Sequence, residues 1–372
     1  MSFLTVLLSP ITLLFGLVLA GLAIGKIRIG HFSLGIAGVL FISILAGALM
    51  KYMISETHVE LILNVQSTMK SFSTLGSSLF VSVIGLQTGF SIKNNSGRSL
   101  LCFVIGILMS LSGVLTMLVI SAIDQTIRYP ILLGVLCGAL TSTPGLSGVC
   151  ELLGDGSNEA VWGYGCSYLL GVVFVVLFAQ MFARKTTDQG EAIPNMAIPT
   201  SRIYPEMILI STVAMLGYVL GSFDIPVLHI SMGSTACMLI IGLLAGFLVQ
   251  KKLGTAQTAS PVFNSFRTLG LSLFFVGNGL TTGMQALNFD FRIVLYGAII
   301  TLAAIFCGLL LCNLLFSQQK LHTEFVVAGG MTSSPAYGAI SSSANEMSVN
   351  CFSFAYFGAL LSLVITIQII GR

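Results

Sequence analysis

The sequence predicts an all-α polytopic membrane protein made of two inverted repeats, each with about five transmembrane helices and one re-entrant or broken hairpin. Three observations lead to this fold class. Hydrophobic residues make up 55% of the 372 residues and charged residues only 8%, whereas soluble proteins carry about 25% charged residues. Several segments reach the roughly 20 apolar residues that a bilayer crossing requires. The chain also contains an internal duplication.

The duplication is clearest in residues 72–89 and 266–283, which are identical at eleven of eighteen positions and lie 194 residues apart. Further along, residues 138–144 match residues 329–335, and Asn158-Glu159 matches Asn345-Glu346. Because the matches follow the same order in both halves, we interpret the chain as two copies of one unit. Two copies of one unit are the usual plan of a secondary transporter.

Each copy contains six apolar segments, separated by short polar stretches. In the first copy they cover residues 4–25, 32–50, 71–91, 100–122, 130–150 and 160–182, and in the second 205–221, 228–250, 265–286, 293–316, 325–341 and 350–370. Residues 183–204 between the copies are polar and contain two prolines. We therefore expect a first membrane repeat at 1–182, a cytoplasmic linker at 183–204 and a second repeat at 205–372.

The distribution of basic residues favours inverted copies. If segments 130–150 and 325–341 enter and leave on one side, eleven Lys and Arg residues lie on the cytoplasmic side and five outside. If all segments span, the first copy places four inside and six outside, against the rule that cytoplasmic loops are positive. We therefore expect re-entrant hairpins and extracellular termini. A broken helix that crosses the membrane remains the alternative for both segments.

The residues expected to carry the chemistry are Thr-Ser-Thr-Pro at 141–144 and Thr-Ser-Ser-Pro at 332–335, each in the middle of an apolar segment. Proline interrupts a helix but is favoured in the first turn after a Ser or Thr cap. We expect Thr143-Pro144 and Ser334-Pro335 to cap and begin new half-helices. The alternative is a simple helix kink, but the pattern occurs in both copies.

The N-terminus of a half-helix offers unpaired N–H groups and a partial positive charge, which suit an anion. The preceding arm ends in carbonyl groups, which suit a cation. Two hairpins entering from opposite faces would bring both tips to the membrane midplane, so we predict a substrate site there. Its expected residues are Thr141, Ser142, Thr143, Pro144, Thr332, Ser333, Ser334, Pro335, Gln87 and Asn278.

Weaker predictions concern other polar residues in or beside the spans. Gln87 and Asn278 would line the cavity, or alternatively form interhelical hydrogen bonds. Asn158, Glu159, Asn345 and Glu346 are candidate ion ligands or gate residues, with helix capping as the alternative. Arg267 stands where the first copy has Ser73, and would neutralise an anionic solute or extend to the membrane interface.

Other classes of function are disfavoured. The eight cysteines lie in or beside apolar segments without C-x-x-C spacing, so we expect core residues rather than disulfides or metal ligands. We expect no metal and no cofactor. The four histidines lie near segment ends and form no catalytic set, so we expect no enzyme. The net charge of +3 is spread over the loops, and we expect no nucleic-acid partner.

The set of Ser33 to Gly35, Gly85 to Gly89 and Gly138 to Pro144 resembles the aspartate–alanine exchanger family of bacterial transporters, and the likeness extends through both copies. The resemblance implies a multi-pass carrier of the bacterial inner membrane for small anions such as acidic amino acids or dicarboxylates, often by exchange. Many members carry a cytosolic regulatory domain between the halves, where this chain has only the short linker. Carriers of this shape also suggest a homodimer by analogy.

The predicted function is therefore secondary active transport of a small organic anion across the lipid bilayer, by antiport and alternating access, with the solute at the hairpin tips. An anion symporter coupled to Na⁺ or H⁺ is the alternative within the same class. A passive channel is the alternative from another class.

Overall fold

The computed structural model describes residues 9–26, 28–29, 32–33, 36–53, 59–91, 97–182, 203–225, 230–231, 233–253, 261–285, 290–315, 323–340 and 346–371. The predicted linker lies almost entirely outside these residues, and so does Asn345. The side chains of Ser334 and Glu346 also lie outside the described part, although both residues belong to described helices.

The first copy forms the predicted helices, and its fifth apolar segment is broken into two. The helices are α2 (Pro10–Gly25), α3 (Ala37–Met53), α4 (Val59–Ser91), α5 (Gly97–Ile123), α6 (Tyr129–Ala139), α7 (Thr143–Leu153), the 3₁₀ turn η2 (Gly154–Gly156) and α8 (Ser157–Phe182). The break between α6 and α7 falls at the Thr-Ser-Thr-Pro sequence.

The second copy repeats this order, again with a broken fifth segment. Its helices are α9 (Ile203–Gly221), α10 (Ser234–Leu253), α11 (Pro261–Gln285), α12 (Phe291–Leu315), α13 (Thr323–Gly330), α14 (Ser334–Ile340) and α15 (Glu346–Ile370). Between the first two helices of each copy lies a two-residue antiparallel ladder, β1 (Arg28–Ile29) with β2 (Phe32–Ser33) and β3 (Asp224–Ile225) with β4 (Ile230–Ser231). These ladders are a small addition to the predicted all-α architecture.

Six stretches of the described chain are long and apolar enough to cross a membrane: Asn64–Phe90, Ser99–Ile123, Thr143–Phe182, Ile203–Gly221, Phe291–Leu315 and Asn350–Ile370. Four more apolar helices have 10 to 17 residues, at Pro10–Gly25, Gly38–Lys51, Tyr129–Ala139 and Ser234–Gln250. Large apolar side chains such as Phe15, Leu115 and Phe306 are about two-thirds exposed. Such a surface is typical of a protein that faces lipid.

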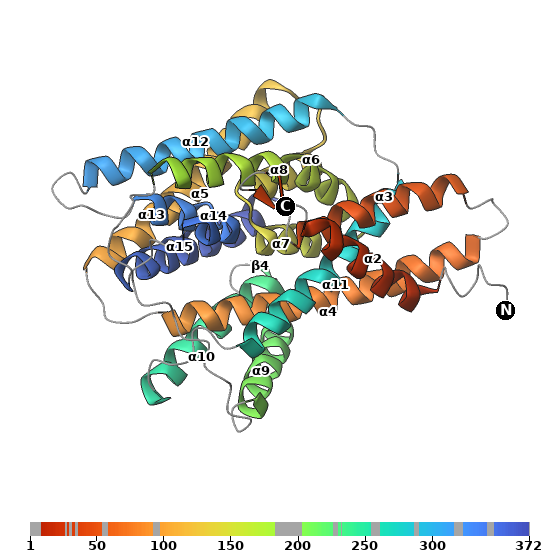
Figure 1. The fold of residues 1–372 in the computed structure, drawn as a ribbon, viewed down its shortest axis with the longest axis horizontal. Helices are drawn as coiled ribbons and strands as arrows, with labels where there is room; N and C mark the ends of the chain where they lie inside the picture. The colour runs from red at the N-terminus through yellow and green to blue at the C-terminus, as the bar shows by residue number, and fades with distance from the viewer. Residues whose placement is uncertain are drawn as a thin grey trace.

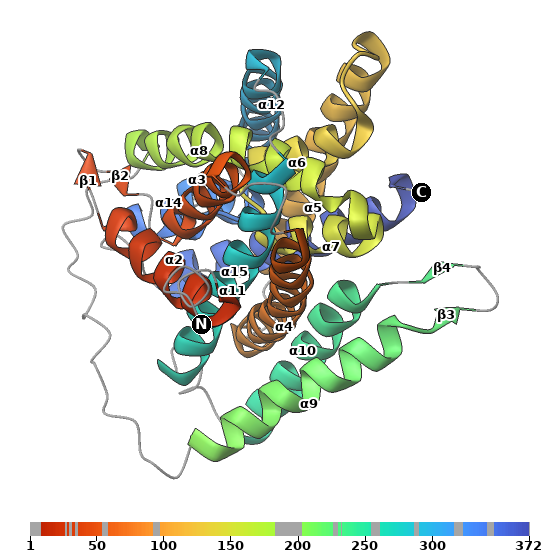
Figure 2. The ribbon, with the colours of Figure 1, turned by 90° about the vertical axis from the view of Figure 1, so that its right-hand side faces the viewer.

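The helices form two bundles, and each copy contributes to both. The support bundle consists of α2, α3 and α4 from the first copy with α9, α10 and α11 from the second. The hairpin bundle consists of α5 to α8 with α12 to α15. In Figure 1 the hairpin bundle occupies the upper left, and Figure 2 shows α9 and α10 side by side at the edge of the support bundle. The bundles meet mainly where α7, α8 and α15 contact α4, α10 and α11.

Equivalent residues of the two copies meet at the centre of the support bundle. Helices α4 and α11 cross at Gly76 and Gly270, which are 194 residues apart. A Cβ on Gly76 would lie 2.5 Å from the Gly270 carbonyl oxygen, and a Cβ on Gly270 would lie 2.7 Å from the Gly76 carbonyl oxygen. Because this contact is reciprocal, a pseudo-twofold axis relating the copies passes through the crossing.

Candidate functional site

Both predicted hairpins form, and each turns through the same backbone motif. After α6, the Ser142 N–H donates to the Cys137 carbonyl at 2.8 Å and the Thr141 N–H to the Gly138 carbonyl at 2.9 Å. After α13, the Ser333 N–H donates to the Ala328 carbonyl and the Thr332 N–H to the Gly329 carbonyl, at 2.9 and 2.7 Å. This pair of bonds defines a Schellman motif at the end of a helix.

The motif places a threonine in a conformation that threonine rarely adopts. Thr141 has φ 52° and Thr332 has φ 49°, and they are the only non-glycine residues with positive φ in the described chain. The left-handed region is unfavourable for a β-branched residue, whereas glycine adopts it readily. A threonine at both positions therefore indicates that its side chain has a role that glycine cannot fill.

That role is a reciprocal bond between the two tips. The Thr141 hydroxyl donates to the Met331 carbonyl at 2.7 Å, and the Thr332 hydroxyl donates to the Leu140 carbonyl at 2.9 Å. All four groups are buried. The tips therefore contact each other directly, as the sequence predicted, and the two bonds are related by the same exchange of copies as the Gly76–Gly270 crossing.

The caps of the second arms differ from the sequence prediction by one residue. The N-cap of α7 is Ser142, whose Oγ accepts from the Gly145 N–H at 3.1 Å, and Thr143 is the first residue of the helix. In the second hairpin, the Ser333 Oγ accepts from the Ala336 N–H at 3.3 Å in the same way. The prediction of Thr143 and Ser334 as caps was wrong because the Schellman turn ends at the preceding serine, which is already extended.

The turn consumes most of the amide groups that were expected to face an anion. In the first turn of α7, the amides of Ser142 and Gly145 have partners within the hairpin, and Pro144 has no N–H. The Thr143 N–H has no acceptor among the described residues. In the second hairpin the Ser333 and Ala336 amides have equivalent partners, and Pro335 has no N–H. The first tip thus retains one backbone donor, at Thr143, rather than several.

The carbonyls at the end of the first arm, which were expected to suit a cation, already accept hydrogen bonds. Those of Cys137 to Leu140, at and just after the end of α6, accept from Ser142, Thr141, Thr301 and Thr332. In the second hairpin, the carbonyls of Ala328, Gly329 and Met331 accept from Ser333, Thr332 and Thr141.

Tyr164 of α8 is a site neighbour that the sequence analysis missed. Its side chain is fully buried, and its hydroxyl shares a hydrogen bond of 3.0 Å with the Thr143 hydroxyl. Its ring stacks on Tyr168, with centroids 5.0 Å apart. A tyrosine within an apolar helix needs a partner for its hydroxyl, and this requirement is the signal that the sequence offered.

Gln87 and Asn278 make interhelical hydrogen bonds, which was the alternative to lining the cavity. The Asn278 Nδ2 donates to the Ser73 hydroxyl of α4 and to the Phe274 carbonyl. The Gln87 Nε2 donates to the Asn264 Oδ1 at 3.2 Å, and its Oε1 accepts from Arg267 at 3.5 Å. Both residues belong to the support bundle, and these partners lie outside the hairpin tips.

The candidate gate residues fall into different positions. Asn158 lies in the first turn of α8 beside Thr282 of α11, whose hydroxyl is 3.4 Å from its Oδ1. The Glu159 carboxylate pairs with Arg128 at the start of α6, within the hairpin bundle. Glu346 is the first residue of α15.

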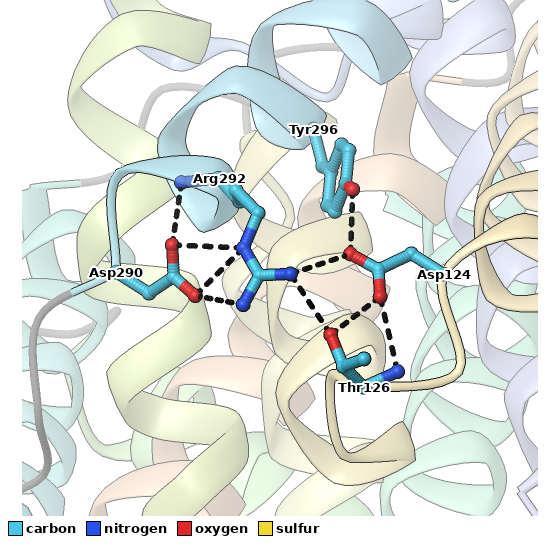
Figure 3. A network of polar contacts seen from close by, with 5 residues as sticks. All are labelled: Asp124, Thr126, Asp290, Arg292 and Tyr296. Carbon is cyan, nitrogen blue, oxygen red and sulfur yellow. Dashed lines mark hydrogen bonds and ion pairs between the residues drawn. The ribbon is translucent and has the colours of Figure 1, made fainter.

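A polar network at the edge of the hairpin bundle joins the end of α5 to the start of α12 (Figure 3). Arg292 donates to Asp290 and to Asp124, which also accepts from the Tyr296 hydroxyl at 2.7 Å. Hydrogen bonds from the Thr126 hydroxyl, the Tyr296 hydroxyl and the Thr126 amide lower the pKa of Asp124 to about 2, with a smaller effect of Arg292. Hydrogen bonds from Arg292 lower the pKa of Asp290 as well.

Comparison with known proteins identifies the family. The family model Asp-Al_Ex, described as a predicted permease membrane region, matches residues 13–184 and 209–372. Similar sequences include uncharacterized transporters of Bacteroides thetaiotaomicron (33% identity over 165 residues, 43% of this chain and 28% of the relative) and Corynebacterium glutamicum (32% over 185 residues, 47% and 31%). An uncharacterized transporter of Desulfotalea psychrophila is 33% identical over 185 residues, which cover 48% of this chain and 30% of the relative.

The matched regions therefore span less than a third of the length of these relatives. The family model, in contrast, covers both copies of the repeat and each of the two hairpins. This match accounts for most of the chain and agrees with the multi-pass helical architecture. The chain belongs to the aspartate–alanine exchanger family of membrane permeases.

Proposed function

We propose that the protein is a secondary active transporter of the bacterial inner membrane that exchanges small organic anions, such as acidic amino acids or dicarboxylates. The observation that carries the proposal is the meeting of two half-helix N-termini at the reciprocal Thr141–Thr332 contact. The anion would accept from the Thr143 and Ser334 amides, one from each copy. The hydroxyl groups of Ser142 and Ser333 accept their cap bonds and keep a proton to donate.

The burial of the tips supports alternating access. Ser142 and Ser333 have no exposed surface, and Thr141 and Thr332 are 5% and 4% exposed. The contact between the two tips is therefore shielded from solvent in this conformation, and Thr143 beside it is half-buried. Because the two tips are bonded to each other and lie in one bundle, the hairpin bundle would move as a unit against the support bundle.

Two ion pairs support the inverted arrangement with re-entrant hairpins. Asp124 pairs with Arg292, and Lys70 pairs with Asp155. If every apolar segment crossed the bilayer, the partners of each pair would lie near opposite faces. With re-entrant hairpins, all four residues lie near the external face, where such pairs can form. The five basic residues assigned to that face include Lys70 and Arg292.

Exchange is favoured over cation-coupled symport by the carbonyls at the tips. The carbonyls of Cys137 to Leu140 have protein donors, and so do those of Ala328, Gly329 and Met331. A coupling cation requires oxygen ligands, and a hydrogen bond already occupies one of the two lone pairs of each of these carbonyls. The charge of a substrate anion would then be balanced by an anion moving in the opposite direction.

A counterflow assay in proteoliposomes tests the proposal. Vesicles loaded with unlabelled aspartate, glutamate or succinate should accumulate the labelled form of a transported acid without an imposed ion gradient. Thr143→Val should lower this uptake, because it removes the hydroxyl paired with Tyr164 beside the proposed site, and Ser334→Val is the equivalent change in the second hairpin. Thr116→Val, which loses only a hydroxyl bonded to its own helix, should transport normally.

The assay also separates the alternatives. Uptake that needs a Na⁺ or H⁺ gradient and no internal acid would indicate a symporter. Single-channel currents without counterflow would indicate a pore. Normal counterflow by both Thr143→Val and Ser334→Val would remove the hairpin tips from the transport mechanism.

A further inference from the structure

A polar stripe runs along the second arm of the first hairpin and into the helix that follows. It consists of Ser147 and Glu151 of α7, Asp155 of η2 and Asn158 of α8. Positions separated by three or four residues lie on one face of a helix. Ser147 and Glu151 therefore lie on one face of α7, and Asp155 and Asn158 follow in the 3₁₀ turn and in the first turn of α8.

Each member of the polar stripe contacts the support bundle. The Ser147 and Thr235 hydroxyls share a hydrogen bond of 3.2 Å and are both buried. The remaining contacts join Asp155 to Lys70 of α4, and Asn158 to Thr282 of α11. The Lys70–Asp155 pair is exposed and contributes little by itself. The polar stripe therefore joins α7, η2 and α8 to α4, α10 and α11, across the boundary between the two bundles.

Glu151 makes the strongest of these contacts. Its Oε1 accepts from the Ser234 N–H and from the Ser234 hydroxyl, and its Oε2 accepts from the Thr235 N–H at 2.9 Å. These donors belong to the first turn of α10, so the carboxylate also lies at the positive end of a helix dipole. Charge-assisted hydrogen bonds of this kind are stronger than neutral ones. One carboxylate of the hairpin bundle thus caps a helix of the support bundle.

A glycine before α10 allows the Glu151 carboxylate to come close to the start of that helix. Gly233, directly before α10, has φ 75°. A Cβ at this position would lie 2.7 Å from the Gln368 Nε2 and 3.3 Å from the Glu151 Oε2. Any larger residue would thus be strained and would push against both side chains. The approach of α7 and α15 to the start of α10 therefore depends on a glycine at 233.

We propose that the polar stripe is a latch that holds the two bundles together in this conformation and opens in each transport cycle. This inference rests on the proposed alternating access. When the hairpin bundle moves along α10, the three bonds that converge on Glu151 break together. The offset of 191 residues that aligns Pro144 with Pro335 places Gly338 and Ser342 at the positions of Ser147 and Glu151. The second copy therefore has no matching carboxylate, and the latch biases the equilibrium toward one side.

A reversible cross-link tests whether the latch must open. Ser147→Cys with Thr235→Cys, in a chain whose eight native cysteines are replaced, should form a disulfide on oxidation, because the native hydroxyls are 3.2 Å apart. We expect the cross-link to stop counterflow and a reductant to restore it. The matched controls are the single variants Ser147→Cys and Thr235→Cys, which cannot cross-link within the chain. Oxidation of either should leave counterflow unchanged.

A second measurement is independent of transport. Spin labels at Ile123 of the hairpin bundle and Leu220 of the support bundle, both exposed, report the distance between the bundles. Glu151→Gln and Glu151→Ala should raise the population of a second distance at least about fivefold, a typical coupling between two states. Counterflow that persists in the fully cross-linked protein would overturn the latch and leave the proposed function intact. An unchanged distance distribution in both Glu151 variants would overturn it as well. If the wild-type chain shows no counterflow at all, in contrast, that result would count against the proposed function alone.

Discussion

The two hairpins are alike at their tips and different at their outer ends. Both turn through a Schellman motif with a left-handed threonine, a capping serine and a proline in the next helix. The arms differ, because α6 and α7 have eleven residues each, whereas α13 has eight and α14 has seven. Only the first hairpin has the polar stripe with its carboxylate.

The difference between tips and outer ends indicates that these two parts of the hairpins have separate roles. At the tips, Thr141 and Thr332 each bond the turn of the other hairpin in the same way, so both copies keep the same backbone motif there. The outer ends of the hairpins lie away from the axis and face different parts of the support bundle. The two copies can therefore differ at these outer ends. A difference there makes one of the two transport conformations more stable than the other.

The largest effect is expected from breaking the equivalence of the tips. Thr141→Val and Thr332→Val each leave a buried carbonyl without its donor, at a cost of about 1–3 kcal/mol. We expect each variant to lower the counterflow rate by about 5- to 100-fold, equally for the two positions. The rate in proteoliposomes and the thermal unfolding midpoint in detergent are the measurements.

The double variant and a conservative variant complete this test. Because the two bonds join the same pair of turns, the effects in Thr141→Val/Thr332→Val should not add, with a coupling of about 0.5–3 kcal/mol. Thr141→Ser keeps the hydroxyl and should retain most activity. Strictly additive losses, or a tolerated Thr332→Val beside an inactive Thr141→Val, would show that the tips do not act as one unit.

An intermediate effect is expected at the hydroxyl pair of the first hairpin. Tyr164→Phe removes a buried hydroxyl that shares a bond with Thr143, and a lost bond of this kind costs about 1 kcal/mol. We expect an increase in the KM of the exchanged acid of about fivefold, with a smaller change in kcat. The offset of 187 residues that aligns Asn158 with Asn345 places Cys351 at the position of Tyr164, so Cys351→Ala should not change the KM. Equal effects of both variants would refute the asymmetry.

The smallest effect is expected at the peripheral network of Figure 3. The folded-state pKa of Asp124 is about 2 and that of Asp290 is also lowered, whereas an unfolded aspartate has a pKa of about 3.9. Their contribution to stability is thus present above about pH 4 and is lost as the pH falls toward 2. Between pH 6 and pH 3, the free energy of unfolding should fall less in Asp124→Asn than in the wild-type chain. An identical loss in both would show that this carboxylate does not govern acid stability.

Much of the fold could be predicted from the sequence, because the signals were local or repeated. The apolar segments predicted the helices, and Pro144 and Pro335 predicted the two breaks. The caps were assigned one residue too late because a Schellman turn depends on the φ of Thr141 and Thr332, which sequence patterns do not reveal for a β-branched residue. The two-residue ladders were too short to give any alternating pattern.

The site was predicted less completely, because its contacts join residues far apart in the chain. The hydroxyls of Thr141 and Thr332 were expected to face a solute, yet each bonds a carbonyl about 190 residues away. Tyr164 and Glu151 gain their roles only from the packing of α8 on the first hairpin and of α7 on α10. Such partners are set by the tertiary arrangement of the bundles and leave no periodic signal in the sequence.

The central claim is that an anion binds between the two tips. Its most direct test is a structure of the protein in lipid with the acid that counterflow identifies. We expect density for a carboxylate within hydrogen-bonding distance of the Thr143 and Ser334 amide nitrogens. Density for the acid at a separate location, with both of these amides unoccupied, would contradict the account.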